Sequence, residues 1–86
     1  MPTEEIKRKR AYYRACHRGT KEMDLVLGGF ARAFLDGMPP QEVAAFETLL
    51  DFPDSIIDRW LKGADPEDGS LKSIIRQIQA HCGLPV

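Results

Sequence analysis

A cation, a glycine and an anion lie within five residues in the segment Arg18-Gly19-Thr20-Lys21-Glu22. Glycine adopts the left-handed backbone conformation that commonly ends helices, so a helix that runs to Arg18 can stop at Gly19. Both charged side chains would then point outward. A guanidinium forms two parallel hydrogen bonds with a carboxylate, and a carboxylate accepts hydrogen bonds from amides or cations. The segment therefore predicts a charged docking corner, at which Gly19 lets a partner approach closely.

A plainer interpretation of the same segment stays open. A helix that ends at Gly19 and a second helix that begins near Glu22 give the same residue order for structural reasons alone. An acid in the first turn of a helix interacts favourably with the helix dipole, so Glu22 needs no partner to explain it.

The other residues that could carry chemistry are two Cys-His neighbours, Cys16-His17 and His81-Cys82. Successive residues on a helix point about 100° apart, so neither pair can ligate one metal ion or form a nucleophile and its base within helical geometry. The ligand spacing that zinc sites usually show is also missing. We therefore expect no metal site and no catalytic residue. We also expect reduced, packed thiols rather than a disulfide between Cys16 and Cys82.

Gly28 and Gly29 form the one adjacent glycine pair of the sequence. A dinucleotide-binding fingerprint needs a preceding strand and a third glycine, which this pair lacks. A P-loop needs a lysine after its glycines, and no lysine follows here. Inside a predicted helix the pair instead indicates a close backbone approach or a bend. We expect no tightly bound cofactor, and an interaction module is favoured over an enzyme.

Charge is distributed unevenly along a chain whose formal net charge is −1. The first 22 residues hold seven Lys or Arg and three Glu, whereas the remaining 64 hold five cations and ten acids. A basic helix can bind nucleic acid, although an acidic body repels phosphate. The cations available for such binding are Lys7, Arg8, Lys9, Arg10 and Arg14. A solvated helix or an acidic protein partner is the alternative interpretation.

The length of 86 residues fits one small domain, residues 1–86, with a modest core and no deep substrate cavity. No apolar run approaches the roughly 18 to 20 residues that a membrane span needs. The first five residues, Met1 to Glu5, match neither a signal peptide nor a transit peptide. We therefore expect a soluble, cytoplasmic protein.

Apolar residues recur at helical spacing through most of the sequence, and glycine or proline separates the periodic stretches. The pattern predicts five helices: one ending at Gly19, one over residues 21–35, one starting at Pro40, a short one closed by Gly63, and one capped by Ser70. Their expected core residues are Ile6, Tyr13, Cys16, Met23, Val26, Leu27, Phe30, Ala31, Phe34, Val43, Phe46, Leu49, Leu50, Ile56, Ile57, Trp60, Leu61, Leu71, Ile74, Ile75, Ile78 and Cys82. The fold class is therefore predicted to be all-α, a compact five-helix bundle.

The eleven residues from Ala15 to Leu25, ACHRGTKEMDL, resemble the signature of the succinate dehydrogenase assembly factor family, the flavinator proteins. Further matches to the family occur at Phe30, before Glu42, at Phe46–Asp51, at Pro53-Asp54, at Trp60-Leu61 and at Ile75–Gln79. The resemblance covers about residues 9 to 80, which is nearly the whole domain. His17 departs from the pattern, because many relatives have a second arginine there.

The resemblance implies a small helical factor that binds the flavoprotein subunit of succinate dehydrogenase, and often of fumarate reductase. Such a factor promotes covalent attachment of FAD to a histidine of that client, so the flavin belongs to the client and the factor is a chaperone rather than an enzyme. By position, Arg18, Gly19 and Glu22 form the working motif, with Asp24 and His17 as flanking partner contacts. We also expect a monomer when the protein is free.

Two other functions stay open at this point. One is a nucleic-acid-binding protein that acts through the basic first helix, although the sequence has no clear recognition helix or aromatic stacking platform. The other is a direct carrier of FAD, although no cofactor cradle is evident.

Overall fold

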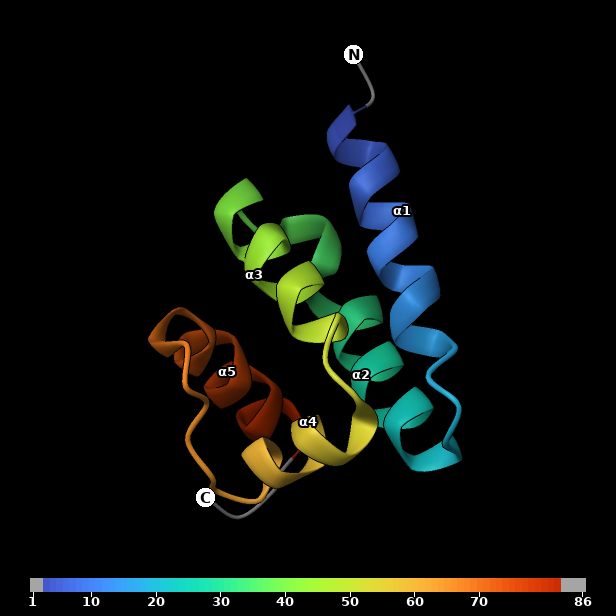
Figure 1. Ribbon diagram of the computed structural model, residues 1–86. Helices are drawn as coiled ribbons and strands as arrows, with labels where there is room; N and C mark the ends of the chain where they lie inside the picture. Colours follow the sequence, from blue (N-terminus) through green and yellow to red (C-terminus); the bar gives the residue numbers. More distant parts are fainter. Residues whose placement is uncertain (1–2, 83–86) are drawn as a thin grey trace.

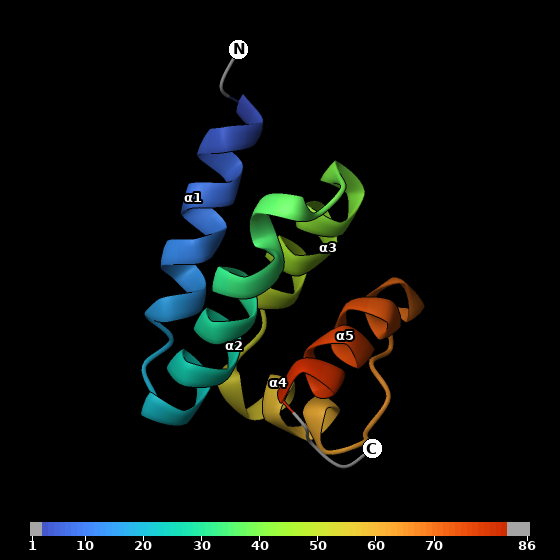
Figure 2. The same ribbon diagram turned by 180° about the vertical axis from the view of Figure 1, so that it is seen from behind.

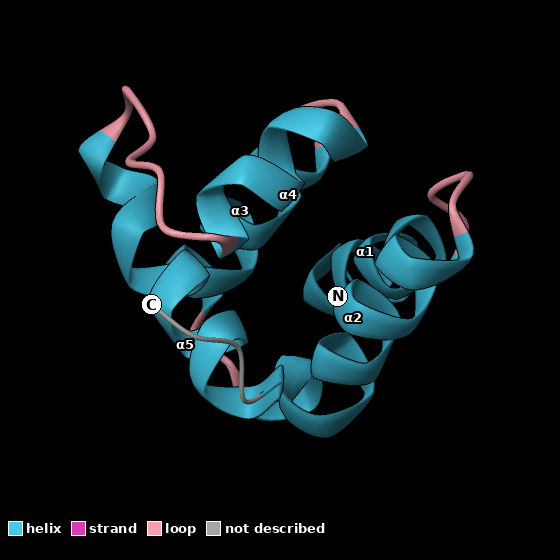
Figure 3. Ribbon diagram, turned by 90° about the horizontal axis from the view of Figure 1, so that it is seen from below, coloured by secondary structure: helices cyan, strands magenta, loops and turns pink. Residues whose placement is uncertain are grey.

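Five α-helices joined by short connections make up residues 3–82, the part of the chain that this computed structural model describes (Figure 1). Their bounds are α1 Thr3–Cys16, α2 Lys21–Phe34, α3 Pro40–Leu50, α4 Asp54–Leu61 and α5 Lys72–Cys82, with 3-10 turns η1 at Leu35–Gly37 and η2 at Gly69–Leu71. The described residues include no strand, and the view from below shows helix interrupted only by short loops (Figure 3). The predicted all-α fold with five helices is confirmed.

The helices are arranged as two pairs with α3 between them. Helices α1 and α2 lie side by side at one side of the molecule, and α4 and α5 lie together at the other (Figures 1 and 2). Helix α3 contacts both α1 and α5, and α2 also contacts α5. The described residues thus form one body, with extents of 38 × 27 × 21 Å. Within it, every helix is too short or too polar to cross a bilayer.

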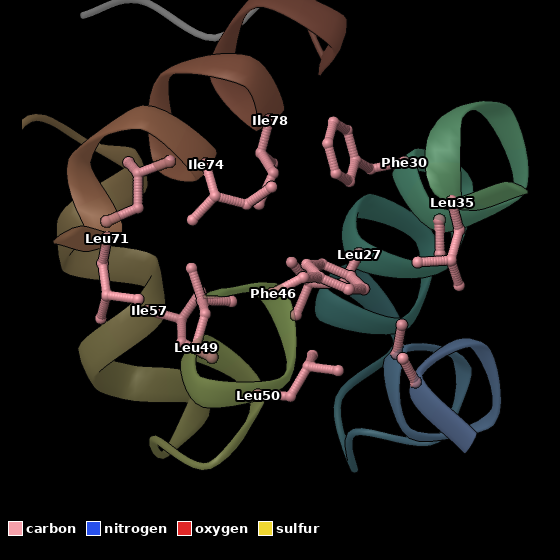
Figure 4. Packing of buried hydrophobic residues seen from close by; sticks show 14 of the residues in the cluster. Leu27, Phe30, Leu35, Phe46, Leu49, Leu50, Ile57, Leu71, Ile74 and Ile78 are labelled. Carbon is pink, nitrogen blue, oxygen red and sulfur yellow. The ribbon is translucent and has the colours of Figure 1, made fainter. Parts of the chain in front are cut away.

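The core is built around Phe46 of α3, which lies between Leu27 of α2 and the isoleucines of α5 (Figure 4). Phe46 is fully buried, and its ring centroid is 5.7 Å from that of Phe30. Every apolar residue predicted to face inward from α3 is buried. The described core residues predicted for the fifth helix are also buried, namely Leu71, Ile74, Ile75 and Ile78. The helical periodicity therefore identified the central part of the core correctly.

The predicted inward stripe of α1 is wrong at Ile6 and Tyr13, whereas its third member, Cys16, is partly buried against α2. Ile6 and Tyr13 are 54% and 63% exposed, and the residues that α1 buries completely are Ala11 and Ala15. Small side chains let two helices approach closely, so this helix packs through its alanines instead of through its larger apolar residues. A third expected core residue, Phe34 at the end of α2, is 46% exposed.

Gly28 of α2 lies against Cys16 of α1 at close range. A Cβ atom built on Gly28 would lie 2.9 Å from Cys16 Sγ and 3.5 Å from Cys16 Cα, whereas one built on Gly29 would meet no atom within 4 Å. The close approach indicated by the glycine pair is therefore confirmed at Gly28, and the neighbour lies within the chain. The expectation of two reduced thiols at Cys16 and Cys82 involves the side chain of Cys82, which lies outside the described residues.

The ends of α4 and α5 are stabilised by specific hydrogen bonds. Gly63 has φ of +115°, and the amides of Gly63 and Ala64 donate to the carbonyls of Trp60 and Arg59, the pattern of a Schellman C-cap. The predicted cap at Ser70 is wrong, because Asp68 occupies that role: its carboxylate accepts from the Ser70 amide at 2.9 Å and starts η2 ahead of α5. The aspartate comes two residues earlier because the 3-10 turn precedes the α-helix.

Candidate functional site

The corner between α1 and α2, residues 17–20, contains the charged segment singled out from the sequence. Helix α1 ends at Cys16, two residues before the expected end at Arg18. Gly19 has φ of +109°, a left-handed conformation that side chains disfavour, so the backbone turn strongly favours glycine there. A Cβ atom at Gly19 would meet nothing within 4 Å, so the protein itself does not crowd this position.

The side chain of Arg18 points into the protein, which corrects the expectation that it faces outward. It is 12% exposed, and Nε forms an ion pair with Asp54 Oδ1 at 2.8 Å. Its two terminal nitrogens donate to the carbonyl oxygens of Leu50, at 2.5 Å, and Phe52, at 2.6 Å. A single guanidinium thus joins the α1–α2 corner to the end of α3 and the start of α4.

This arrangement suits the helix ends that it joins. The carbonyl of Leu50 is among the last of α3, which have no partner inside the helix, so a cation there complements both the free acceptor and the negative end of the dipole. Asp54 is the first residue of α4, where an acid is favoured. Asp54 Oδ2 also accepts from the Thr20 hydroxyl at 3.3 Å, which ties both sides of Gly19 to the same carboxylate.

Thr20 and Asp24 set the start of α2. The Thr20 hydroxyl oxygen accepts from the Met23 amide at 3.3 Å, so Thr20 is the N-cap of the helix. Asp24 is partly buried and its carboxylate accepts from the Arg18 amide at 2.5 Å. The predicted flanking residue Asp24 therefore belongs, together with Arg18, to the contacts that fix the shape of the corner.

Glu22 and His17 are on the outside of the same corner. Glu22 is exposed in the first turn of α2, and among the described residues no hydrogen bond or ion pair joins its carboxylate to Arg18. His17 is also exposed; its ring stacks on Tyr13 with centroids 4.1 Å apart, and Nδ1 lies 2.8 Å from the Tyr13 carbonyl oxygen. With Gly19 exposed between them, these residues form a surface that is open to a partner.

A shallow groove of about 340 Å³ lies beside Glu22, between the start of α2 and α4. Its polar lining includes Glu22, Asp54, Asp58 and Lys62. The hydrogen bond from Lys62 to Asp58, and the charge of that carboxylate, raise the pKa of Lys62 above its usual value, with a smaller contribution from Glu22. Asp54 and Asp58 are paired with Arg18 and Lys62, so Glu22 carries the remaining acidic charge of this lining, which favours a partner that presents a cation or hydrogen-bond donors.

Three basic residues of α1 contact other parts of the bundle. Arg8 donates to the carbonyl oxygens of Leu35 and Met38, Arg10 pairs with Glu47 at 2.8 Å, and Arg14 pairs with Asp51 at 2.5 Å. Three of the five cations that a nucleic-acid-binding helix would need thus contact the body of the chain. The uneven charge of the sequence is explained by the attachment of a basic helix to an acidic bundle.

The structure brings the five predicted site residues together, but in two groups. Arg18 and Asp24 hold the corner from within, and His17, Gly19 and Glu22 lie on its outer side. Sequence reasoning missed Asp54 as the partner of Arg18, although Pro53-Asp54 was among the matched segments. An acid directly after a proline, at a helix start, was the available signal. Within residues 3–82 no group of three or more His, Cys, Asp or Glu is placed to hold a metal ion.

Comparison with known proteins identifies the class to which this fold and corner belong. The family model described as "Flavinator of succinate dehydrogenase" matches residues 9–82, and the chain therefore belongs to that family. Among curated proteins, the chain is 42% identical over 60 residues to the FAD assembly factor SdhE of Acetobacter pasteurianus, covering 70% of this chain and 55% of that protein. No solved structure matches the chain significantly.

Other relatives carry related names. The chain is 38% identical over 65 residues to the FAD assembly factor SdhE of Coxiella burnetii, covering 74% of this chain and 79% of that protein. It is 39% identical over 56 residues to a mitochondrial succinate dehydrogenase assembly factor 2, from Debaryomyces hansenii, covering 65% of this chain and 39% of that protein. The match thus extends over most of some relatives and about half or less of others.

Proposed function

We propose that this protein is an assembly factor that binds the flavoprotein subunit of succinate dehydrogenase and promotes the covalent attachment of FAD to it. Membership of the flavinator family over residues 9–82 is the observation that carries this proposal. Both bacterial relatives described above are named FAD assembly factors. The protein contributes binding contacts, and the chemistry of flavin attachment takes place in the client.

The corner between α1 and α2 is the proposed contact surface for the client. A binding surface gains affinity when it is already held in its bound shape, because less conformational entropy is lost on association. The four polar contacts of Arg18, to Asp54, Leu50, Phe52 and Asp24, hold the corner in this way. Arg18 and Asp24 therefore act in binding by positioning the residues around them.

Direct contact with the client is assigned to Gly19, Glu22 and His17. The exposed carboxylate of Glu22 accepts hydrogen bonds from a client amide or cation. The backbone at Gly19 is open on its outer side, so a client segment can approach it without meeting a side chain. His17 and Tyr13 add a stacked aromatic pair next to that opening.

Several finer parts of this proposal go beyond the family assignment. We propose that fumarate reductase is a second client and that FAD is held by the client and not by this chain. We also propose that the free protein is a monomer and is located in the cytoplasm. A titration of the isolated protein with FAD separates the assembly factor from a direct flavin carrier, since only a carrier changes flavin fluorescence in the absence of client.

The central experiment measures covalent flavin in the client. Cells that lack this gene are complemented with the wild-type chain or with Gly19→Arg, and the flavoprotein subunit is separated under denaturing conditions and scored for flavin fluorescence. We expect the wild type to restore covalent flavin and to copurify with the flavoprotein subunit. Normal flavin attachment in cells without the gene would overturn the proposed function. Normal attachment with Gly19→Arg alone would remove the corner from the mechanism.

A further inference from the structure

A second, larger groove of about 520 Å³ lies on the opposite side of α4, between this helix and the loop that leads to α5. Its apolar wall is made by Phe52, Ile56, Trp60 and Leu71. The rings of Phe52 and Trp60 meet edge to face, with centroids 4.8 Å apart, and Phe52 and Ile56 are partly exposed. Trp60 is 7% exposed and Leu71 is fully buried, so the accessible apolar surface of the groove comes mainly from Phe52 and Ile56.

The outer edge of this groove is acidic. Asp65, Glu67 and Asp68 line it from residues 63–69, a segment without any cation, and Arg59 is the one basic residue in the lining. Hydrogen bonds from the Ser70 side chain and backbone lower the pKa of Asp68, so this carboxylate stays ionised well below neutral pH. The three acids are exposed, and a partner that fits here must carry positive charge.

The groove is continuous with the proposed client surface through residues 50–54. Arg18 donates to the carbonyl of Phe52 and pairs with Asp54, while the Phe52 ring forms part of the groove wall. One short connection between α3 and α4 thus contributes to both surfaces. A client docked at the corner is placed next to the groove by this connection.

From these observations we infer that the groove is a second docking site for the flavoprotein subunit, taking a segment with a Lys or Arg beside a large apolar side chain. This inference rests on the proposed function, since it assumes the same client. The apolar side chain packs on the exposed parts of Phe52 and Ile56, next to Trp60, and the cation lies at the edge beside Glu67. Two docking points on one rigid body fix the orientation of the client, which a single corner does not.

Trp60 provides a direct test, because it is the one tryptophan of the chain. The protein labelled with 5-fluorotryptophan gives a single fluorine resonance, and the unlabelled flavoprotein subunit is silent in that spectrum. We expect this resonance to shift or broaden when the flavoprotein subunit is added. Formation of the complex is followed independently by size-exclusion chromatography of the same samples.

A charge reversal then tests the acidic edge. Glu67→Lys is matched by Asp36→Lys, an equal charge change at an exposed position of η1 away from the groove. We expect Glu67→Lys to weaken client binding at least about fivefold at low salt, with the difference shrinking as salt is added, and Asp36→Lys to bind within about twofold of the wild type. Thermal unfolding of both variants checks that each is folded.

The outcomes separate the two proposals. If a wild-type complex forms but the Trp60 resonance is unchanged, or if Glu67→Lys binds as well as Asp36→Lys, the groove is not a client site and the corner proposal stands. If the flavoprotein subunit forms no complex with the wild type, the proposed function is overturned and the groove inference with it.

Discussion

The ion pair between Arg18 and Asp54 connects two corners of the bundle that are 36 residues apart in sequence. Nε and Oδ1 are 2.8 Å apart, and the two side chains are only 12% and 18% exposed. The two terminal nitrogens of the same guanidinium donate to the carbonyls of Leu50 and Phe52, so all three of its nitrogens bind groups within the protein. The arginine of the charged segment therefore stabilises the corner from within, and the glutamate of that segment faces outward.

Substitution of Arg18 should destabilise the fold. Arg18→Ala leaves a largely buried carboxylate and two carbonyls without their donor, and loss of one partner from such a pair costs about 3 kcal/mol. Urea denaturation measures the change in free energy of unfolding. Arg10→Ala is the matched control, because Arg10 is 57% exposed in its pair with Glu47, and exposed pairs contribute less than about 1 kcal/mol. Equal losses for the two variants would contradict the positioning role of Arg18.

A side chain added at Gly19 should weaken client binding more than it destabilises the fold. Its positive φ makes Gly19→Ala and Gly19→Arg cost about the same, about 1 to 2 kcal/mol, because the Cβ atom meets no neighbour within 4 Å in either case. The longer side chain of Gly19→Arg, however, occupies the space proposed for the client. We expect both variants to have similar melting temperatures and only Gly19→Arg to abolish client binding. Equal client affinity for the two would show that the space outside Gly19 is empty in the complex.

Glu22→Ala should separate binding from stability. The side chain is exposed, so we expect the free energy of unfolding to change by no more than about 0.5 kcal/mol. Removal of one partner of a desolvated charged contact weakens a complex by about 2 to 5 kcal/mol, which calorimetric titration with the flavoprotein subunit can measure. Asp36→Ala, at another exposed acid, should leave the affinity unchanged. Wild-type affinity of Glu22→Ala would exclude this carboxylate from the interface.

Gln79 is the buried polar residue of the described core, at 4% exposure. Its Nε2 donates to the carbonyls of Trp60 and Leu61 at 3.3 and 3.1 Å, at the end of α4. Gln79→Met keeps the size of the side chain and removes the donor, and a buried acceptor left without its partner costs about 1 to 3 kcal/mol. Gln77→Met on the same helix is the control, since Gln77 is less buried and binds the side chain of Glu42. A smaller loss for Gln79→Met than for Gln77→Met would contradict the capping role.

Local patterns predicted the helices and most of the core because both depend on neighbouring residues. Apolar residues at three- and four-residue steps identified the buried faces of α3 and α5, and glycine and proline marked the ends of α4. The inward face of α1 was missed because this helix buries Ala11 and Ala15, whose small size gives little hydrophobic signal next to Ile6 and Tyr13.

The direction of Arg18 could not be predicted from the sequence. Its partners lie 32 to 36 residues away, and two of them are backbone carbonyls, which have no residue type to recognise. Glu22 was predicted to face outward and does so, because an acid in the first turn of a helix needs no partner within the protein. The local pattern thus identified the charged segment, but only the tertiary contacts show that Arg18 is buried within the corner while Glu22 is exposed.

The two glycines inside α2 should respond in opposite ways to the same change. At Gly28 an added methyl group would lie 2.9 Å from Cys16 Sγ and 3.5 Å from Cys16 Cα, so Gly28→Ala must displace the Cys16 side chain or shift α1, and overpacking of this kind costs about 1 to 3 kcal/mol. At Gly29 the methyl group meets nothing within 4 Å, and Gly29→Ala should stabilise the helix by up to about 1 kcal/mol through its greater helix propensity. Thermal and urea unfolding of the two variants measure the difference. The double variant Cys16→Ala with Gly28→Ala removes the sulfur from the contact and should recover part of the loss. No recovery would show that the backbone of Cys16, and not its side chain, sets the distance between the two helices.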